Sequence, residues 1–132
     1  MGKPAATANH SVVGVDTHIV MVPTPGGPVP TPLPHPFSGK LDGGLINTVK
    51  IGGQAAAVVG STATNQPSHT PTPPGTSFQK PPANQGTVFM GSPTVKIGGK
   101  AAARMGDPVK TCNDPADVPV GQIIAAGTVM IG

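Results

Sequence analysis

The chain has 132 residues, including 19 glycines, 18 prolines and one cysteine, and it lacks tryptophan and tyrosine. One cysteine excludes an internal disulfide, and no apolar run approaches the roughly 18 residues of a membrane helix. The net charge of +3 comes without a basic cluster or an aromatic platform for bases, so we expect no nucleic-acid partner. This length predicts a single domain, residues 1–132, whose modest core needs an additional stabilising element.

Short strands separated by turns are predicted along the whole chain, because no long segment has an uninterrupted 3.6-residue period. The alternation of residues 11–22 predicts one or two strands. The prolines that follow, spaced nearly every second residue over 23–36, predict a polyproline-like extended segment rather than a central strand. Further strands are predicted at 85–90 and 120–124, and Asp107 is predicted to be a turn residue.

One unit is written twice, at residues 47–61 and 92–107. Each copy contains Thr-Val-Lys-Ile-Gly-Gly, a variable residue and a run of alanines, which predicts a β-hairpin with a Gly-Gly turn. The chain ends, at residues 127–132, with the first half of this unit and begins, at residues 2–6, with the second half. We therefore expect the termini to complete a third hairpin. Three units predict an all-β fold, a small cone with pseudo-threefold symmetry and Pro/Gly-rich connections.

The three connecting segments, residues 8–47, 58–93 and 104–127, carry the residues that could bind a metal. Under threefold symmetry these segments project from the same end of each unit and converge at one pole. Imidazoles and a thiolate at one point suit a tetrahedral, structural zinc site. The predicted ligands are His18, His35, His69 and Cys112, with His10 in reserve because it lies closer to a repeat unit. Histidines without a metal role remain the alternative, since neither C-x-x-C nor H-x-x-x-H spacing is present.

The sequence gives little support to an enzyme. Glutamate is absent, the five aspartates show no paired spacing, and no serine lies in a G-x-S-x-G context. Cys112 with a histidine base would be the alternative nucleophile, but no activating helix N-terminus is predicted beside it. We therefore expect a protein without catalytic activity.

The segment Gly99–Asp107 resembles the Pro-Ala-Ala-Arg motif of PAAR-repeat proteins, and the spacing of the units extends the resemblance over essentially the whole chain. None of the three copies has the full Pro-Ala-Ala-Arg sequence. The copies are Pro4-Ala5-Ala6-Thr7, Ala55-Ala56-Ala57-Val58 and Ala101-Ala102-Ala103-Arg104.

The resemblance implies a sharpened cone on the blunt end of a trimeric β-helical spike, with one copy per trimer, in a contractile injection machine such as a type VI secretion system or phage-tail-like particle. It also implies a zinc ion near the apex, held by three histidines and one cysteine that correspond to His18, His35, His69 and Cys112. The hairpin rim would then contact the spike. The matching rim positions are Val49, Lys50, Val95, Lys96, Val129 and Met130.

No secretory signal is visible, so we expect cytoplasmic synthesis, incorporation at the particle tip, and export with contact to the target membrane only on firing. No domain follows Gly132 in this sequence, which predicts a tip without a fused toxin; separate effector proteins are further candidate partners. The alternative function is a free metal-binding interaction or adaptor module that carries an effector and does not pierce.

Overall fold

The computed structural model describes residues 2–132, so Met1 of the predicted domain lies outside the described part. Within residues 2–132 there are strands and no helix, which confirms the predicted all-β class; accordingly, this part of the chain has no helix that could span a membrane. The strands are β1 (Lys3–Pro4), β2 (Ser11–Val22), β3 (Val29–Gly43), β4 (Ile46–Ile51), β5 (Gln54–Ala56), β6 (Thr62–Asn65), β7 (Ser77–Phe78), β8 (Gln85–Val88), β9 (Lys96–Ile97), β10 (Lys100–Ala101), β11 (Pro108–Thr111), β12 (Val118–Ile124) and β13 (Met130–Ile131).

Six of these strands close into a small antiparallel barrel. Their order is β12-β11-β8-β6-β3-β2, and β12 pairs with β2 through Gln122 and Val13 to complete the circle. Side chains alternate between the inside and the outside along each strand. The buried inward residues include Val12, Phe37, Leu41, Ala63, Val88, Val109 and Ile123. The connecting segments are therefore not loops on a separate body, since their strands build the barrel and its core.

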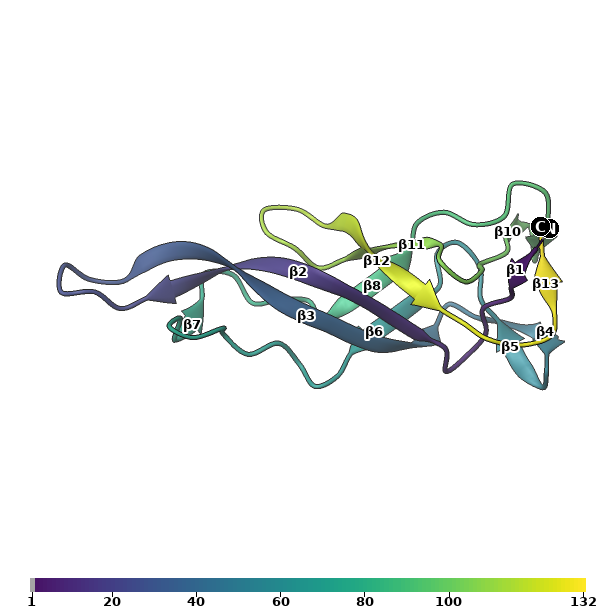
Figure 1. The fold of residues 1–132 in the computed structure, drawn as a ribbon, viewed down its shortest axis with the longest axis horizontal. Coiled ribbons are helices and arrows are strands. Elements are labelled where there is room, and N and C mark those ends of the chain that lie inside the picture. The colour runs from purple at the N-terminus through teal and green to yellow at the C-terminus, as the bar shows by residue number, and fades with distance from the viewer. Residues whose placement is uncertain (1) are drawn as a thin grey trace.

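The long hairpin of β2 and β3 extends past the barrel and forms one end of the molecule (Figure 1). All 12 residues of β2 pair with β3. The polyproline prediction is therefore wrong from residue 29 onward. Prolines occupy every second position from Pro30 to Pro36 and their side chains point outward. β6 pairs only with the Gly39–Gly43 end of β3, so the other edge of the proline-rich part does not pair with β6. Proline is tolerated on such an edge because its missing N–H is not needed for pairing.

The opposite end, here called the base, contains three equivalent two-stranded hairpins, β4–β5, β9–β10 and β1–β13. The third is made from the two ends of the chain, as predicted, and Figure 1 shows both termini together at this end. The hairpins share one register. Equivalent pairs are Lys3 with Ile131, Lys100 with Ile97, and Gln54 with Ile51.

Backbone hydrogen bonds join the three hairpins in a closed ring. The N–H of Ala6 donates to the carbonyl of Ala103, Ala103 donates to Ala57, and Ala57 donates back to Ala6, each with an N···O distance of 3.0 Å. Alanine fits this position because a larger side chain would separate backbones that approach so closely. The predicted pseudo-threefold symmetry is thus present in the backbone bonding itself.

A turn capped by a side chain follows each alanine run. The donor and acceptor pairs are Thr7 N with His10 Nδ1 (2.9 Å), Val58 N with Ser61 Oγ (3.0 Å), and Arg104 N with Asp107 Oδ2 (2.7 Å). Asp107 is therefore a turn residue, as predicted. His10 occupies the equivalent position in the third unit, which assigns it to the base instead of the pole.

Candidate metal centre

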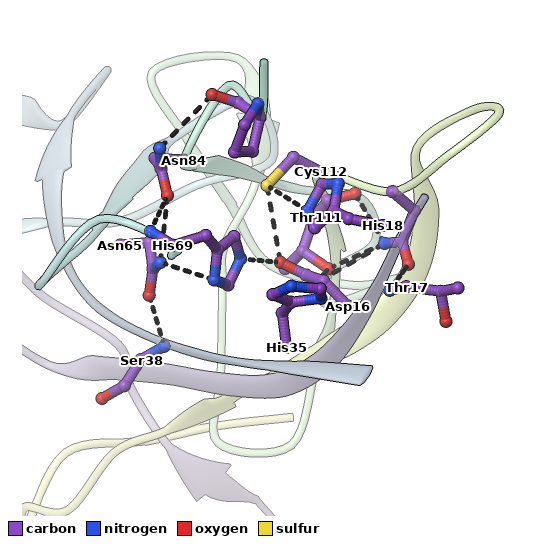
Figure 2. Close-up of polar contacts among 12 residues, drawn as sticks. Asp16, Thr17, His18, His35, Ser38, Asn65, His69, Asn84, Thr111 and Cys112 are labelled. Atoms are coloured by element: carbon purple, nitrogen blue, oxygen red, sulfur yellow. Dashed lines mark hydrogen bonds and ion pairs between the residues drawn. The ribbon is translucent and has the colours of Figure 1, made fainter. Parts of the chain in front are cut away.

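Asp16 and His18 are the first members of a buried polar cluster inside the barrel. They lie two residues apart on β2 and therefore point to the same, inward face. His35 lies on β3 directly opposite Asp16. His69 comes from the segment between β6 and β7, and Cys112 immediately follows β11. Figure 2 shows side chains from all three connecting segments meeting at this place, as the threefold arrangement predicted.

Four side chains bring metal-binding atoms close together. One donor atom each from Asp16, His18, His69 and Cys112 lies within 4.8 Å of all the others. Cys112 Sγ is 3.6 Å from His18 Nε2 and 3.4 Å from Asp16 Oδ2, and His69 Nε2 is 2.8 Å from the same Asp16 oxygen. Three predicted ligands thus belong to this group. Asp16 was missed, although its position two residues before His18 on a predicted strand was a usable signal.

The fourth predicted ligand, His35, borders the group. Its ring centroid lies 5.4 Å from that of His18 and 5.6 Å from that of His69. Its Nδ1 donates to the carbonyl of Leu33 at 2.9 Å, and its Nε2 accepts from the N–H of Thr72 at 3.1 Å. His35 is therefore neutral here, with the proton on Nδ1 and a lone pair on Nε2.

Polar groups around the cluster hold the other two rings in place. His18 Nδ1 faces Asp114 Oδ2 at 3.5 Å and has no hydrogen-bond partner within residues 2–132. His69 Nδ1 lies 3.2 Å from Asn65 Nδ2. Such contacts on the nitrogen that faces away from the cluster fix the direction of an imidazole, which is how metal-binding histidines are commonly oriented.

Burial dominates the electrostatics of the cluster. It lowers the pKa of His18, against the opposing effect of Asp114, and it lowers the pKa of His35. Burial, followed by the nearby Asp16 carboxylate, raises the pKa of the Cys112 thiol to about 11. The lowered pKa values favour the neutral, metal-binding form of His18 and His35, whereas the Cys112 thiol has to lose its proton on metal binding.

The charge of Asp16 has no lysine or arginine partner within residues 2–132. Asp16 is fully buried, and among the ion pairs of residues 2–132 its contact is with His69, not with lysine or arginine. A buried carboxylate beside a thiol and two imidazoles is a suitable environment for a divalent cation, because the cation offsets negative charge that no lysine or arginine balances.

The fold and the cluster together define a class of protein: a small all-β body with three equivalent hairpins at its base and a buried group of histidine, cysteine and carboxylate donors. Residues 78–132 match the family model described as the PAAR motif. This finding confirms the resemblance over residues 78–132 and supports the assignment of the chain as a PAAR-repeat protein. PAAR proteins are structural spike-tip proteins, so the match supports a role related to the spike tip of contractile injection or type VI secretion systems. The chain has no significant match among curated proteins.

Proposed function

We propose that this protein caps the blunt end of a trimeric β-helical spike and forms its point, with one copy bound per trimer. The observation that carries the proposal is the closed ring of Ala6, Ala57 and Ala103 with its three hairpins of equal register. A single chain with a threefold base presents equivalent contacts to all three chains of a threefold partner. Residues 1–132 act as one domain in this proposal, because both ends of the chain are needed to close the base.

The proposed docking surface is the rim of the three hairpins. Val49, Val95 and Val129 occupy one equivalent position, followed in each unit by Lys50, Lys96 and Met130. Val129 and Met130 are 45% and 57% exposed, so the rim presents neighbouring apolar side chains that a partner could bury. Val95 is partly buried against the base core, so it would support the rim more than contact the spike.

The opposite end has the shape that piercing requires. The β2–β3 hairpin narrows to a single turn beyond the barrel (Figure 1). Paired strands with prolines at every second position resist bending, because proline fixes its own φ angle. In this proposal the protein is carried at the tip of an assembled particle and meets the target membrane when the particle fires.

We further propose that the buried cluster holds a structural zinc ion through His18, His35, His69 and Cys112. The three imidazole centroids are 5.0, 5.4 and 5.6 Å apart. With a Zn–N distance of about 2.0 Å, a ring centroid lies about 3.2 Å from the ion, so tetrahedrally arranged imidazoles have centroids about 5.2 Å apart. The spacing of the rings therefore supports three histidine ligands, although His35 Nε2 has to exchange its bond with Thr72 N for the ion.

A bound zinc ion would supply cross-links between all three connecting segments. Such cross-links would rigidify a barrel whose core contains a single phenylalanine ring, Phe37, among small aliphatic side chains. Other residues would hold the ligand side chains in place. The Leu33 carbonyl fixes the tautomer of His35, Asp114 orients the ring of His18, and Asn65 orients that of His69.

Spike binding is tested by co-expression with a trimeric spike protein and native mass spectrometry of the purified complex. We expect one copy per trimer. The double variant Val129→Asp, Met130→Asp should weaken binding at least tenfold, since two charges would have to be desolvated at the rim. Val29→Asp is the matched control, because Val29 is similarly exposed, at 46%, but lies on the β2–β3 hairpin. A wild-type protein that remains a free monomer beside the spike would exclude the capping role.

Zinc is tested by elemental analysis of the purified wild-type protein and of Cys112→Ser. We expect about one zinc per chain in the wild type and much less in the variant, because serine is a poor zinc ligand. Wild-type protein without zinc would refute the site. A protein that binds zinc but no spike would instead fit the free metal-binding adaptor module.

A further inference from the structure

Asp16 is a buried charged residue that the proposed zinc site does not use as a ligand. It is fully buried and accepts hydrogen bonds from four side chains, three of which, His69, Thr111 and Cys112, are labelled in Figure 2. The donors are His69, Thr111, Cys112 and Asn113. Asp16 belongs to the first connecting segment, His69 to the second and the other three donors to the third. One carboxylate thus joins all three segments at the pole.

The two oxygens of this carboxylate have different partners. Oδ1 accepts from Thr111 Oγ1 and from Asn113 Nδ2, and neither of these residues is a candidate ligand. Oδ2 accepts from His69 Nε2 at 2.8 Å and from Cys112 Sγ at 3.4 Å, and both of these residues are candidate ligands. One oxygen is therefore bound to the scaffold, while the other faces the metal donors.

We propose that Asp16 is a positioning residue that keeps His69 and Cys112 assembled at the pole when no metal is bound. The inference rests on the proposed zinc site. The hydrogens that Oδ2 accepts are carried by His69 Nε2 and Cys112 Sγ, the atoms that face the cluster. A metal ion that binds these atoms replaces both hydrogens, so it ends the two bonds to Oδ2. The bonds of Oδ1 to Thr111 and Asn113 persist.

The proposal predicts that Asp16 stabilises the metal-free protein more than the zinc-bound protein. Without zinc, loss of Oδ2 as an acceptor leaves two buried donors without partners and frees their side chains to rotate. With zinc bound, the ion itself fixes the same two side chains. A residue that only supports the fold would contribute equally in both states.

The test compares wild type with Asp16→Asn by urea unfolding, each in EDTA and in excess zinc. Asparagine keeps one carbonyl oxygen for Thr111 and Asn113, but its amide group cannot accept from His69 or Cys112. We expect a lower unfolding midpoint for the variant in EDTA and a much smaller difference in zinc. Asp42→Asn is the control, since Asp42 is exposed and its side chain bonds only Thr64 within the described chain.

Each other outcome is decisive. Equal loss of stability with and without zinc would overturn the proposal in favour of a purely structural Asp16, and a greater loss in zinc would make Asp16 a direct ligand. If zinc fails to stabilise the wild type, the proposed zinc site is wrong. The role of Asp16 is then still decided in EDTA, where an unchanged midpoint for the variant would overturn it.

A second measurement needs no variant. Imidazole ¹⁵N–¹H spectra of the wild type in EDTA should show a hydrogen-bonded Nε2–H of His69, protected from solvent exchange, and its signal should disappear when zinc is added. An Nε2–H that exchanges freely in EDTA would contradict the role of Asp16, even if Asp16→Asn does not fold.

Discussion

Acidification should destabilise the metal-free protein through His18 and His35. Each side chain is 1% exposed, and burial lowers the pKa of both. In the unfolded chain a histidine takes up its proton near pH 6.5. The unfolded state therefore binds more protons than the folded state as the pH falls below that value. Stability is complete above about pH 6.5 and is lost as the pH falls toward the lowered pKa values.

The magnitude follows from the number of protons. Between the unfolded and folded pKa values, one imidazole changes the unfolding free energy by up to about 1.4 kcal/mol per pH unit, and the two together by up to about 2.7 kcal/mol. From pH 6.5 to 5.5 the two together lose up to about 2 kcal/mol, because an unfolded imidazole is only half protonated at pH 6.5, and this loss is a large part of a typical total of about 5–15 kcal/mol. Urea unfolding in EDTA, followed by circular dichroism because the chain lacks tryptophan, measures it directly.

A variant separates these two residues from the other acid-sensitive groups. His35→Gln removes one titrating imidazole, so the slope of unfolding free energy against pH below 6.5 should fall by about half. NMR titration of His18 in the metal-free protein should give a pKa below 6.5. A stability that is constant or increases between pH 6.5 and 5.5 would refute the reasoning, and so would a slope unchanged by His35→Gln.

Two further predictions concern single buried groups. Ser61→Ala should lower the unfolding free energy by about 1–3 kcal/mol, or Tm by several degrees. The buried Ser61 hydroxyl accepts from Val58 N at 3.0 Å and donates to the Gly44 carbonyl at 2.9 Å, and both groups would lose their partner. A loss below about 0.5 kcal/mol would show that the capped turn contributes little to stability. The Cys112 thiol, with its pKa raised to about 11, should react with iodoacetamide at pH 8 in EDTA far more slowly in the folded protein than in urea, and equal rates would contradict its burial.

The base could be predicted from the sequence because the same residue pattern is repeated in each of its units. Equivalent Gly-Gly turns and alanine runs imply equivalent hairpins, and the split unit at the two termini followed from the same comparison. The strands of the barrel were harder to predict. β6 consists of Thr62–Asn65, which is too short and polar for a recognisable pattern, and its pairing with β3 and β8 depends on residues far apart in the chain. The proline-rich half of β3 was misjudged for the same reason, since its unpaired edge is a property of the sheet.

The residue types of the candidate site can be predicted from the sequence more readily than its geometry. His18, His69 and Cys112 are predicted as imidazole and thiolate donors on converging segments, and their donor atoms lie close together. His10 lies close to a repeat unit in the sequence, and its role as a turn cap, equivalent to those of Ser61 and Asp107, assigns it to the base. Asp16 has no paired acidic neighbour in the sequence, and its only signal as a site residue is its position two residues before His18 on the same strand face.

The threefold equivalence of the side chains is kept near the base and is lost near the polar cluster at the pole. Val12, Ala63 and Val109 follow the three capped turns at equivalent positions, and all are fully buried. Two residues farther along the same strands the equivalent positions are Gly14, Asn65 and Thr111. Asn65 contacts His69, Thr111 bonds Asp16, and a Cβ at Gly14 would lie 2.8 Å from the Cα of Gly121.

The proposed zinc site and spike contact would give this change of residue type a geometric reason. A threefold-symmetric pole would supply donors in sets of three, whereas a tetrahedral ion requires four. A base that matches a trimer must keep its three units alike, but a site that surrounds one ion must make them different. The apolar core of the barrel lies between the pole and the base. The three units can therefore differ at the pole while the ring of backbone hydrogen bonds at the base stays symmetric.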